Sequence, residues 1–117
     1  MRQPDDIALI HIAEYFQALA EPMRLKILHG LRSGEKNVTE LVALSGGSQA
    51  NVSKHLALLR DAKLIKRTSR GTKAYYSIAD QRTFDLCNLV CGQIADTMRL
   101  EAAANEAFIT ALQSQPT

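Results

Sequence analysis

A tight Ser-Gly-Gly turn at residues 45–47 constrains the fold of this chain more than any other feature, because segments with helical periodicity lie directly before and after it. The preceding segment, "NVTELVALS", begins with Asn37, and the side-chain oxygen of Asn37 or Thr39 can cap a helix. Gly46 suits the left-handed residue that commonly ends a helix. The sequence therefore predicts a short helix that ends in a sharp turn.

The segment after the turn, "QANVSKHLALLRDA", predicts a second helix, which Ser48 can cap. Its apolar residues recur at the spacing of one helix face. We expect this inner face to comprise Val52, Leu56 and Leu59. Two short helices joined by a tight turn form a helix-turn-helix, which the sequence places at about residues 37–62.

Two further helices are predicted upstream. Asp5 or Asp6 can cap the first, and its apolar residues at roughly helical spacing are Ile7, Ile10, Tyr15, Phe16 and Leu19. Pro22 ends this helix and fits the first position of the next, where the missing N–H costs nothing. That helix, "PMRLKILHGL", is predicted to end near residues 33–34. Its expected buried residues are Leu25, Ile27, Leu28 and Leu31.

The residues after the helix-turn-helix predict a β-hairpin and a last helix. Period-two alternation on either side of "SRGT" predicts a hairpin over about residues 64–78. The alternating residues are Ile65, Arg67, Ala74, Tyr76 and Ile78. Asp80 can cap the last helix, over about residues 81–113. The predicted fold class is therefore mainly α with a β-hairpin wing, a winged helix-turn-helix in a single domain of residues 1–117.

Positive charge is concentrated in the middle of the chain. The formal net charge is only +2. Residues 48–76 nevertheless contain seven basic residues and one acid, so this basic segment carries +6 and the remainder −4. Its basic residues are Lys54, Arg60, Lys63, Lys66, Arg67, Arg70 and Lys73. An ordinary solvated surface can carry such charge, but its concentration in one segment favours a polyanionic partner such as nucleic acid.

The N-terminal half of the second helix of the motif holds the candidate base-contacting residues, because this end of the helix enters the major groove. They are Ser48, Gln49, Ala50, Asn51, Ser53 and Lys54. Gln49 and Asn51 can each form two hydrogen bonds with adenine, and Lys54 can reach guanine or phosphate. Ala50 can contact a thymine methyl group. Any one of these residues could simply solvate a surface helix, but together they favour sequence-specific DNA binding.

The predicted hairpin tip is a second candidate DNA contact. Arg67, Arg70 and Lys73 lie around Gly71, which predicts a flexible basic finger. Such a finger can contact phosphates or enter the minor groove.

Two stretches carry a resemblance to a known family, "LAEPMRLKILHGL" and "VTELVALSGGSQANVSKHLALLRDAKLIKRTSRGTKAYYSI". Their residues and their order resemble the ArsR (ArsR/SmtB) family of bacterial winged-helix repressors, over about residues 13–80. The resemblance implies a homodimer built from the first and last helices. It also implies a double-stranded DNA operator with an inverted repeat, from which an effector releases the protein.

The resemblance does not extend to two metal sites of the family. Arsenite-sensing members carry Cys-x-Cys at the start of the helix before the recognition helix, where this chain has Asn37 and Thr39. Zinc-sensing members carry aspartate and histidine ligands on the last helix. The matching residues here are Asp80, Arg82, Gln93 and Asp96, and two carboxylates without imidazole make a poor zinc site. We therefore expect no metal site at the usual family positions.

Both cysteines, Cys87 and Cys91, lie in "FDLCNLVC" near the start of the last helix. A spacing of four residues places them on one helix face. They can be small apolar core residues, or a thiol switch, although no basic residue lies one turn away to favour the thiolate. They can also bind arsenite or a soft metal ion, with His29 as a third ligand, since His29 falls near a position that the family uses for sensing. An effector that involves no thiol is the other alternative.

Several classes of function are disfavoured by the sequence. We expect no enzyme, because no nucleophile–base pair or Gly-rich phosphate loop is present and the three histidines lack metal-ligand spacing. No apolar run is long enough for a membrane span. The N-terminus lacks the pattern of a signal peptide, so we expect a cytoplasmic protein. The alternative to DNA binding is a winged-helix protein-interaction module, which the basic segment disfavours because interface cores are depleted in charge.

Overall fold

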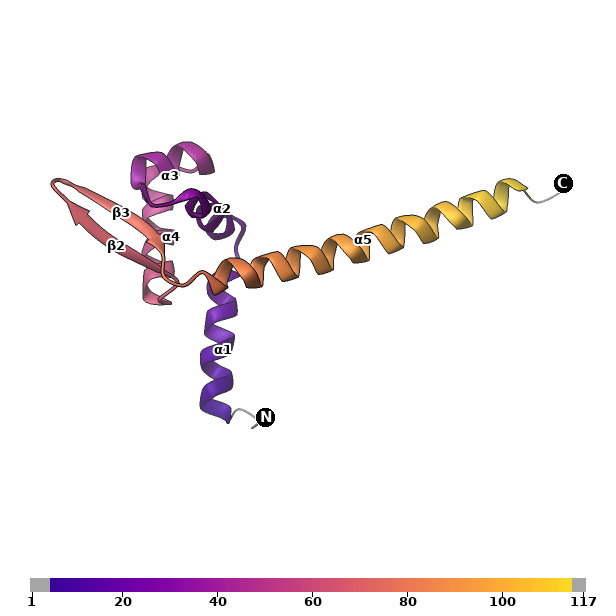
Figure 1. The fold of residues 1–117 in the computed structure, drawn as a ribbon, viewed down its shortest axis with the longest axis horizontal. Helices are drawn as coiled ribbons and strands as arrows, with labels where there is room; N and C mark the ends of the chain where they lie inside the picture. Colours follow the sequence, from indigo (N-terminus) through magenta and orange to yellow (C-terminus); the bar gives the residue numbers. More distant parts are fainter. Residues whose placement is uncertain (1–4, 115–117) are drawn as a thin grey trace. The chain divides into compact units, whose positions relative to one another are not determined.

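The computed structural model describes residues 5–114 (Figure 1). The elements are α1 (Asp6–Leu19), α2 (Pro22–Gly30), the 3₁₀-helix η1 (Leu31–Ser33), β1 (Lys36–Asn37), α3 (Val38–Ser45), α4 (Gln49–Asp61), β2 (Ile65–Arg70), β3 (Lys73–Ile78) and α5 (Arg82–Ser114). They divide into two compact units, one that ends at Gln81 and one that begins at Arg82. The predicted fold class, a winged helix-turn-helix, is confirmed, and the two units are described separately below.

The helices begin where the sequence places caps. The Asp5 carboxylate accepts a hydrogen bond from the backbone N–H of the third residue of α1, at 2.8 Å. Pro22 is the first residue of α2. Asn37 and Glu40 form a reciprocal capping box at the start of α3, with N···O distances of 2.9 and 3.0 Å. Ser48 caps α4. Each cap satisfies a backbone donor that the first turn of a helix leaves free.

The turn between α3 and α4 has a steric reason for its glycines. Gly46 ends α3 with a φ of 76°, in the left-handed region that favours glycine. A Cβ atom on Gly47 would lie 3.0 Å from Met23 Cε and 3.2 Å from Val52 Cγ2. The turn therefore packs closely on α2 and α4, and together with α3 and α4 it forms the helix-turn-helix.

The core of the first unit lies between α2, α3, α4 and the sheet. Its buried apolar residues are Ile27, Leu28, Leu31, Leu41, Val52, Leu56, Leu59, Leu64, Ile65 and Tyr76. The predicted inner face of α4 is confirmed. Leu25 was expected in this core and is instead 43% exposed. At ~100° per residue it lies about 160° around α2 from Ile27, on the opposite face.

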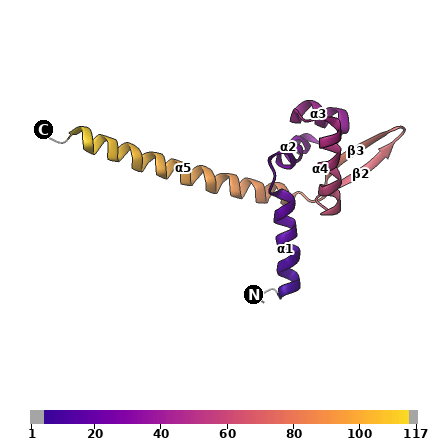
Figure 2. The same cartoon turned by 180° about the vertical axis from the view of Figure 1, so that it is seen from behind.

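The wing is a sheet of three antiparallel strands in the order β1-β3-β2. β2 pairs with β3 from Ile65↔Ile78 to Arg70↔Lys73, and the two strands project as an arm from the helices of this unit (Figures 1 and 2). The sequence predicted only this hairpin. β1 was missed because a strand of two residues shows no periodicity. It joins the base of the wing to the start of α3.

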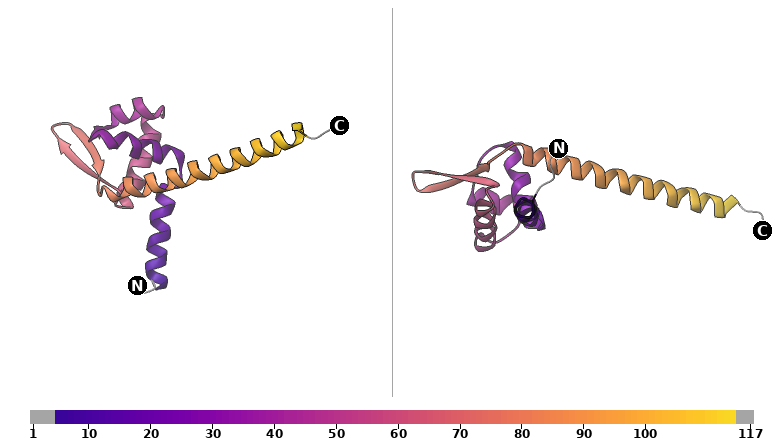
Figure 3. Two further views of the ribbon diagram at one scale, coloured as in Figure 1. Left: turned by 45° about the vertical axis from the view of Figure 1, so that its right-hand side comes forward. Right: turned by 90° about the horizontal axis from the view of Figure 1, so that it is seen from below.

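The second unit contains α5, a helix of 33 residues that both views of Figure 3 show from the side. It runs from Arg82 to Ser114, where the sequence placed a helix over about residues 81–113. Thr83 and Phe84 are its buried residues. The large apolar residues that it exposes are Leu89, Val90, Ile94, Met98, Leu100, Phe108, Ile109 and Leu112. A cap from Asp80 stays a prediction. None of the helices within residues 5–114 is long and apolar enough to cross a membrane.

Candidate nucleic-acid interface

The residues predicted to read DNA form one exposed surface on α4. Ser48, Gln49, Ala50, Asn51, Ser53 and Lys54 are all exposed, and Val52 is the one buried residue between them. The reason is helical periodicity, because Val52, Leu56 and Leu59 turn toward the core and fix the rotation of the helix about its axis. The N-terminal half of α4 is therefore held with its polar side chains directed to solvent.

The start of α4 is also fixed by the turn that precedes it. Ser48 Oγ accepts a hydrogen bond from Asn51 N at 3.1 Å, and Ser45 Oγ accepts one from Gly47 N at 3.3 Å. The Ser48 hydroxyl retains its proton, with which it can donate to a DNA phosphate. A helix N-terminus also presents free N–H groups and positive dipole charge to an anion. This end of α4 is preorganised for a phosphate contact.

The basic residues of the wing do not form one cluster. Arg67, Arg70 and Lys73 are all exposed, as a DNA contact requires. Side chains alternate between the two faces of a strand, so Arg67 and Arg70 lie on opposite faces of the hairpin. Arg67 Nη1 donates to Ser69 Oγ at 3.2 Å. Lys73 is the cross-strand partner of Arg70 and shares its face.

Arg70 is held by two contacts that the sequence did not predict. Its guanidinium pairs with the Glu35 carboxylate, and its Cζ lies 4.5 Å from the centre of the Tyr75 ring. The side chains of Arg70 and Glu35 are 54% and 39% exposed, respectively. Such an exposed pair contributes little to stability. A DNA phosphate can therefore replace Glu35 as the partner of Arg70.

A second group of polar side chains joins α4 to α1 and α2. It comprises Glu21, Arg24 and His55, of which His55 is buried on the inner side of α4. Arg24 Nη1 lies 3.5 Å from His55 Nδ1, and Glu21 Oε2 lies 3.7 Å from His55 Nε2. The sequence indicates for His55 only that it lacks metal-ligand spacing to the other histidines. The contact with Arg24 has no local signal, because the two residues are 31 positions apart.

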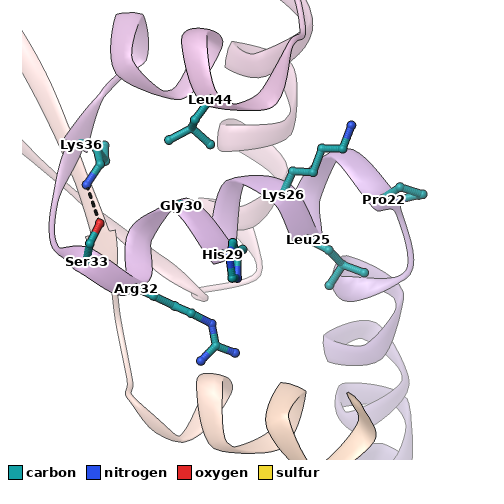
Figure 4. Close-up of a pocket in the computed structure, with 9 residues that line it drawn as sticks. All are labelled: Pro22, Leu25, Lys26, His29, Gly30, Arg32, Ser33, Lys36 and Leu44. Carbon is teal, nitrogen blue, oxygen red and sulfur yellow. Dashed lines mark hydrogen bonds between the residues drawn. The ribbon is translucent and has the colours of Figure 1, made fainter. Parts of the chain in front are cut away.

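His29, the predicted third ligand of a thiol site, is exposed and lines an open pocket between α2 and α3 (Figure 4). The other lining residues are Pro22, Leu25, Lys26, Gly30, Arg32, Ser33, Lys36 and Leu44. Lys36 Nζ donates to Ser33 Oγ at 2.9 Å. His29 is the one imidazole of this pocket, and neither a thiol nor a carboxylate lines it, so the pocket itself offers a metal ion a single ligand.

The two cysteines are accessible within the single chain. Cys87 is partly exposed and Cys91 is exposed. Among residues 5–114, no three His, Cys, Asp or Glu side chains are arranged to hold a metal ion. Asp96, at one of the zinc-type positions, pairs with Arg99. The arrangement provides two thiols on one face of α5.

Comparison with known proteins gives the same family from sequence and from structure. Residues 21–67 match the model described as "Bacterial regulatory protein, arsR family". The chain is 40% identical over 84 residues to a probable mercury resistance operon repressor of Streptomyces lividans, covering 72% of this chain and 67% of the relative. It is 35% identical over 86 residues to the transcriptional repressor SmtB homolog of Synechocystis, covering 74% of this chain and 65% of the relative. The chain thus spans about two thirds of the length of these relatives.

A solved structure extends the similarity beyond the helix-turn-helix. It is a homodimeric winged helix-turn-helix DNA-binding domain from Mycobacterium bovis, described as a possible ArsR-family transcriptional regulator. The TM-score is 0.70 at 30% identity, with 87% of this chain and 95% of that chain covered. The similarity therefore covers nearly the whole of that domain, including its wing.

Proposed function

Because this chain belongs to the ArsR family of bacterial regulatory proteins, we propose that it is a homodimeric repressor that binds an inverted-repeat operator and is released by an effector. The observation that carries the proposal is the exposed polar surface at the N-terminal end of α4, set by the buried face behind it. The basic segment begins with this surface and continues to residue 76, which suits a polyanion.

The family consists of transcriptional regulators and not enzymes, so the expectation that this chain is no enzyme is confirmed. The alternative function is a protein-interaction module without effector-controlled DNA binding. The charge of +6 on residues 48–76 argues against it, since desolvating so many basic groups at a protein interface is costly. Binding to a polyanion such as DNA is instead favoured by each basic group, because each phosphate contact releases counterions.

In the proposed complex, α4 lies in the major groove with its N-terminal end at the base edges. Gln49 and Asn51 pair with adenines and Lys54 reaches a guanine or a phosphate. Ala50 contacts a thymine methyl group, and Ser48 and Ser53 donate to phosphates. The short side chains of Ser48, Ala50 and Ser53 permit close approach of the helix.

The wing supplies phosphate or minor-groove contacts beside the recognition helix. Lys73 and Arg67 are both exposed. Arg67 donates a hydrogen bond to Ser69 on the same strand, a contact that a phosphate can replace. Arg70 exchanges Glu35 for a phosphate when DNA binds. Because Arg67 lies on the other face of the hairpin, we expect Arg70 and Lys73 to contact one stretch of backbone and Arg67 another.

For the effector, we propose a thiol-reactive or thiophilic species that acts at Cys87 and Cys91, such as arsenite or a soft metal ion. Support comes from the position of the two thiols, one turn apart on one face of α5. Soft ions select thiolate ligands, and one relative is named for mercury resistance. His29 is the candidate third ligand from the chain itself. Binding at this site shifts operator affinity through the dimer, for which a coupling of ~1–3 kcal/mol suffices.

The test is fluorescence anisotropy with labelled DNA from upstream of the chain's own coding sequence, in the presence of reductant. Affinity should fall steeply with rising salt because phosphate contacts release counterions. Absence of binding at low salt would overturn the proposal, and a salt-insensitive protein complex would support the alternative.

The effector is tested on the same complex. Arsenite, soft metal ions or polysulfide are added to the wild type and to the Cys87→Ser/Cys91→Ser double variant. We expect at least one agent to release the wild type and leave the double variant bound. If both proteins respond alike to every agent, the cysteines are packing residues and the effector acts elsewhere. A His29→Ala variant then shows whether a third ligand is required.

A further inference from the structure

One partly buried polar cluster connects the end of α1 to the recognition helix α4. Its three side chains come from two places in the sequence, Glu21 and Arg24 at the start of α2 and His55 on α4. It contains the only buried histidine among residues 5–114. Neither base contacts nor phosphate contacts require these residues, since His55 faces inward.

Arg24 holds the C-terminal end of α1. Its Nε donates to Ala18 O at 2.7 Å, and its Nη2 donates to Gln17 O at 3.1 Å. These are carbonyls of the last turn of α1, where a helix leaves acceptor capacity free. A guanidinium binds them in a fixed geometry because its donors form a planar fork. Arg24 therefore fixes the angle between α1 and α2.

The same guanidinium reaches the recognition helix. The third nitrogen, Nη1, lies 3.5 Å from His55 Nδ1, one residue after Lys54 on α4. Glu21 completes the cluster, since its Oε2 accepts from Arg24 N at 3.1 Å and lies 3.7 Å from His55 Nε2. His55 is only 8% exposed, and a buried polar group of this kind is costly to leave without its partners. A rotation of α4 relative to α1 must therefore break contacts at His55.

We propose that Arg24 and His55 are positioning residues that set the orientation of α4 relative to α1, and thereby the separation of operator half-sites that the dimer accepts. The inference rests on the proposed function and deepens it. α1 exposes Ile7, Leu9, Ile10, Ile12 and Phe16, an apolar surface that the proposed homodimer covers. Since α1 is then fixed to the dyad, its angle to α4 determines where the two recognition helices meet the DNA.

A purely stabilising role for the cluster makes a different prediction. Loss of stability lowers the fraction of folded protein and weakens binding to every operator by the same factor. Loss of orientation weakens binding most at the native half-site separation and broadens the range of separations that are tolerated. The two roles are distinguished by the shape of the spacing profile and not by affinity alone.

The experiment measures affinity for a series of duplexes in which the half-site separation changes by one base pair at a time. The proteins are the wild type, Arg24→Lys, His55→Leu, His55→Asn and the Arg24→Lys/His55→Leu double variant. Lysine keeps the charge of Arg24 but cannot bind two carbonyls and a ring nitrogen together. Asparagine places an amide oxygen near the position of Nδ1. Ile27→Val is the matched control, because it removes one buried methyl group and so weakens the core of α2 outside the cluster.

For the wild type we expect one sharply preferred separation. Arg24→Lys and His55→Leu should reduce that preference about fivefold or more, the low end of a typical coupling between sites. The double variant should lose no more than either single variant, because both remove the same connection. His55→Asn should recover much of the preference, and Ile27→Val should keep the wild-type profile.

The inference is wrong if folded His55→Leu and Arg24→Lys proteins keep the wild-type spacing profile while the wild type binds as expected. It is equally wrong if Ile27→Val broadens the profile to the same extent. If His55→Leu does not fold, His55→Asn and Arg24→Lys decide the question. A wild type that binds none of the duplexes overturns the proposed function, and this inference with it.

Discussion

The segment from α2 to β3 and the helix α5 contain similar apolar side chains but use them in opposite ways. Between Pro22 and Ile78 most large apolar residues are buried, and Ile27, Leu41 and Leu59 are fully so. In α5 the large apolar residues from Leu89 to Leu112 are 44–74% exposed. The first region completes its own core. The second carries an apolar surface of the kind that marks a protein–protein interface.

This difference has a simple energetic meaning. Burial of apolar surface contributes about 25 cal/mol per Å², and the winged-helix segment gains this contribution within one chain. A helix gains little from its own backbone hydrogen bonds in water. We therefore expect the exposed apolar residues of α5 to be covered in the proposed homodimer. The similar domain from Mycobacterium bovis is homodimeric.

The largest predicted effect comes from placing charge on this apolar surface. Ile94 and Met98 are 51% and 63% exposed and lie one turn apart on α5. Ile94→Glu/Met98→Glu should prevent dimerisation, because the carboxylates would have to be desolvated at the interface. Operator affinity should then fall by ~10²–10⁴-fold, the advantage that linking two binding modules provides. Analytical ultracentrifugation and fluorescence anisotropy on the same samples measure the two quantities.

The matched control places the same charge on the opposite side of the same helix. Ala103 and Ala107 are exposed, and each lies nine residues after its counterpart, which at ~100° per residue is about 180° around the helix. Ala103→Glu/Ala107→Glu should remain dimeric and keep its operator affinity within severalfold. A dimeric Ile94→Glu/Met98→Glu protein would show that this face of α5 does not form the interface.

The second prediction compares stability in the two regions. Leu59→Ala should lower the free energy of unfolding by about 2–5 kcal/mol, because Leu59 is fully buried and the substitution leaves a cavity. Leu100→Ala removes the same atoms from a residue that is 74% exposed. In the monomeric Ile94→Glu/Met98→Glu background it should cost less than about 0.5 kcal/mol. Urea denaturation followed by circular dichroism gives both values, and equal losses would remove the contrast between the regions.

The same contrast explains which features the sequence could predict. Caps act on backbone groups within a few residues, so the sequence predicts Ser48 and Gly46 as caps and narrows the cap of α3 to Asn37 or Thr39, of which the structure uses Asn37. The inner face of α4 follows from periodicity alone. Leu25 was misassigned because being apolar on a helix does not fix which face a residue occupies.

Features that depend on distant residues were not predicted. Glu35 meets Arg70, and Arg24 meets His55, only because the chain folds back on itself. β1 has no periodicity of its own and exists because β3 offers an edge. The two cysteines share a helix face by their spacing alone, but whether that face is covered depends on residues far away in the sequence, so their exposure could not be predicted.

The third prediction concerns the exposed N-terminal end of the recognition helix α4, which belongs to the well-packed segment. Gln49→Ala should weaken operator binding by about 1–3 kcal/mol and relax specificity at one base pair in each half-site, since it removes a two-point contact with adenine. Ala57→Gln, a substitution at an exposed position further along α4, serves as the control and should leave affinity nearly unchanged. Anisotropy competition with operators altered at single positions provides the measurement. Uniform weakening on all sequences would instead assign Gln49 to phosphate contact.

The smallest predicted effect is a gain. Glu35→Gln removes the carboxylate that pairs with Arg70 and competes with DNA phosphate. Operator affinity at low salt should therefore rise about 1.4- to 5-fold, in line with the ~0.2–1 kcal/mol of an exposed ion pair. Stability should change little for the same reason. Glu106→Gln on α5 changes the net charge equally but lies far along the sequence from the wing. An equal gain in both variants would mean that net charge, and not release of Arg70, controls the affinity. A gain confined to Glu35→Gln that disappears when Arg70→Ala is added would identify Glu35 as a competitor built into the wing.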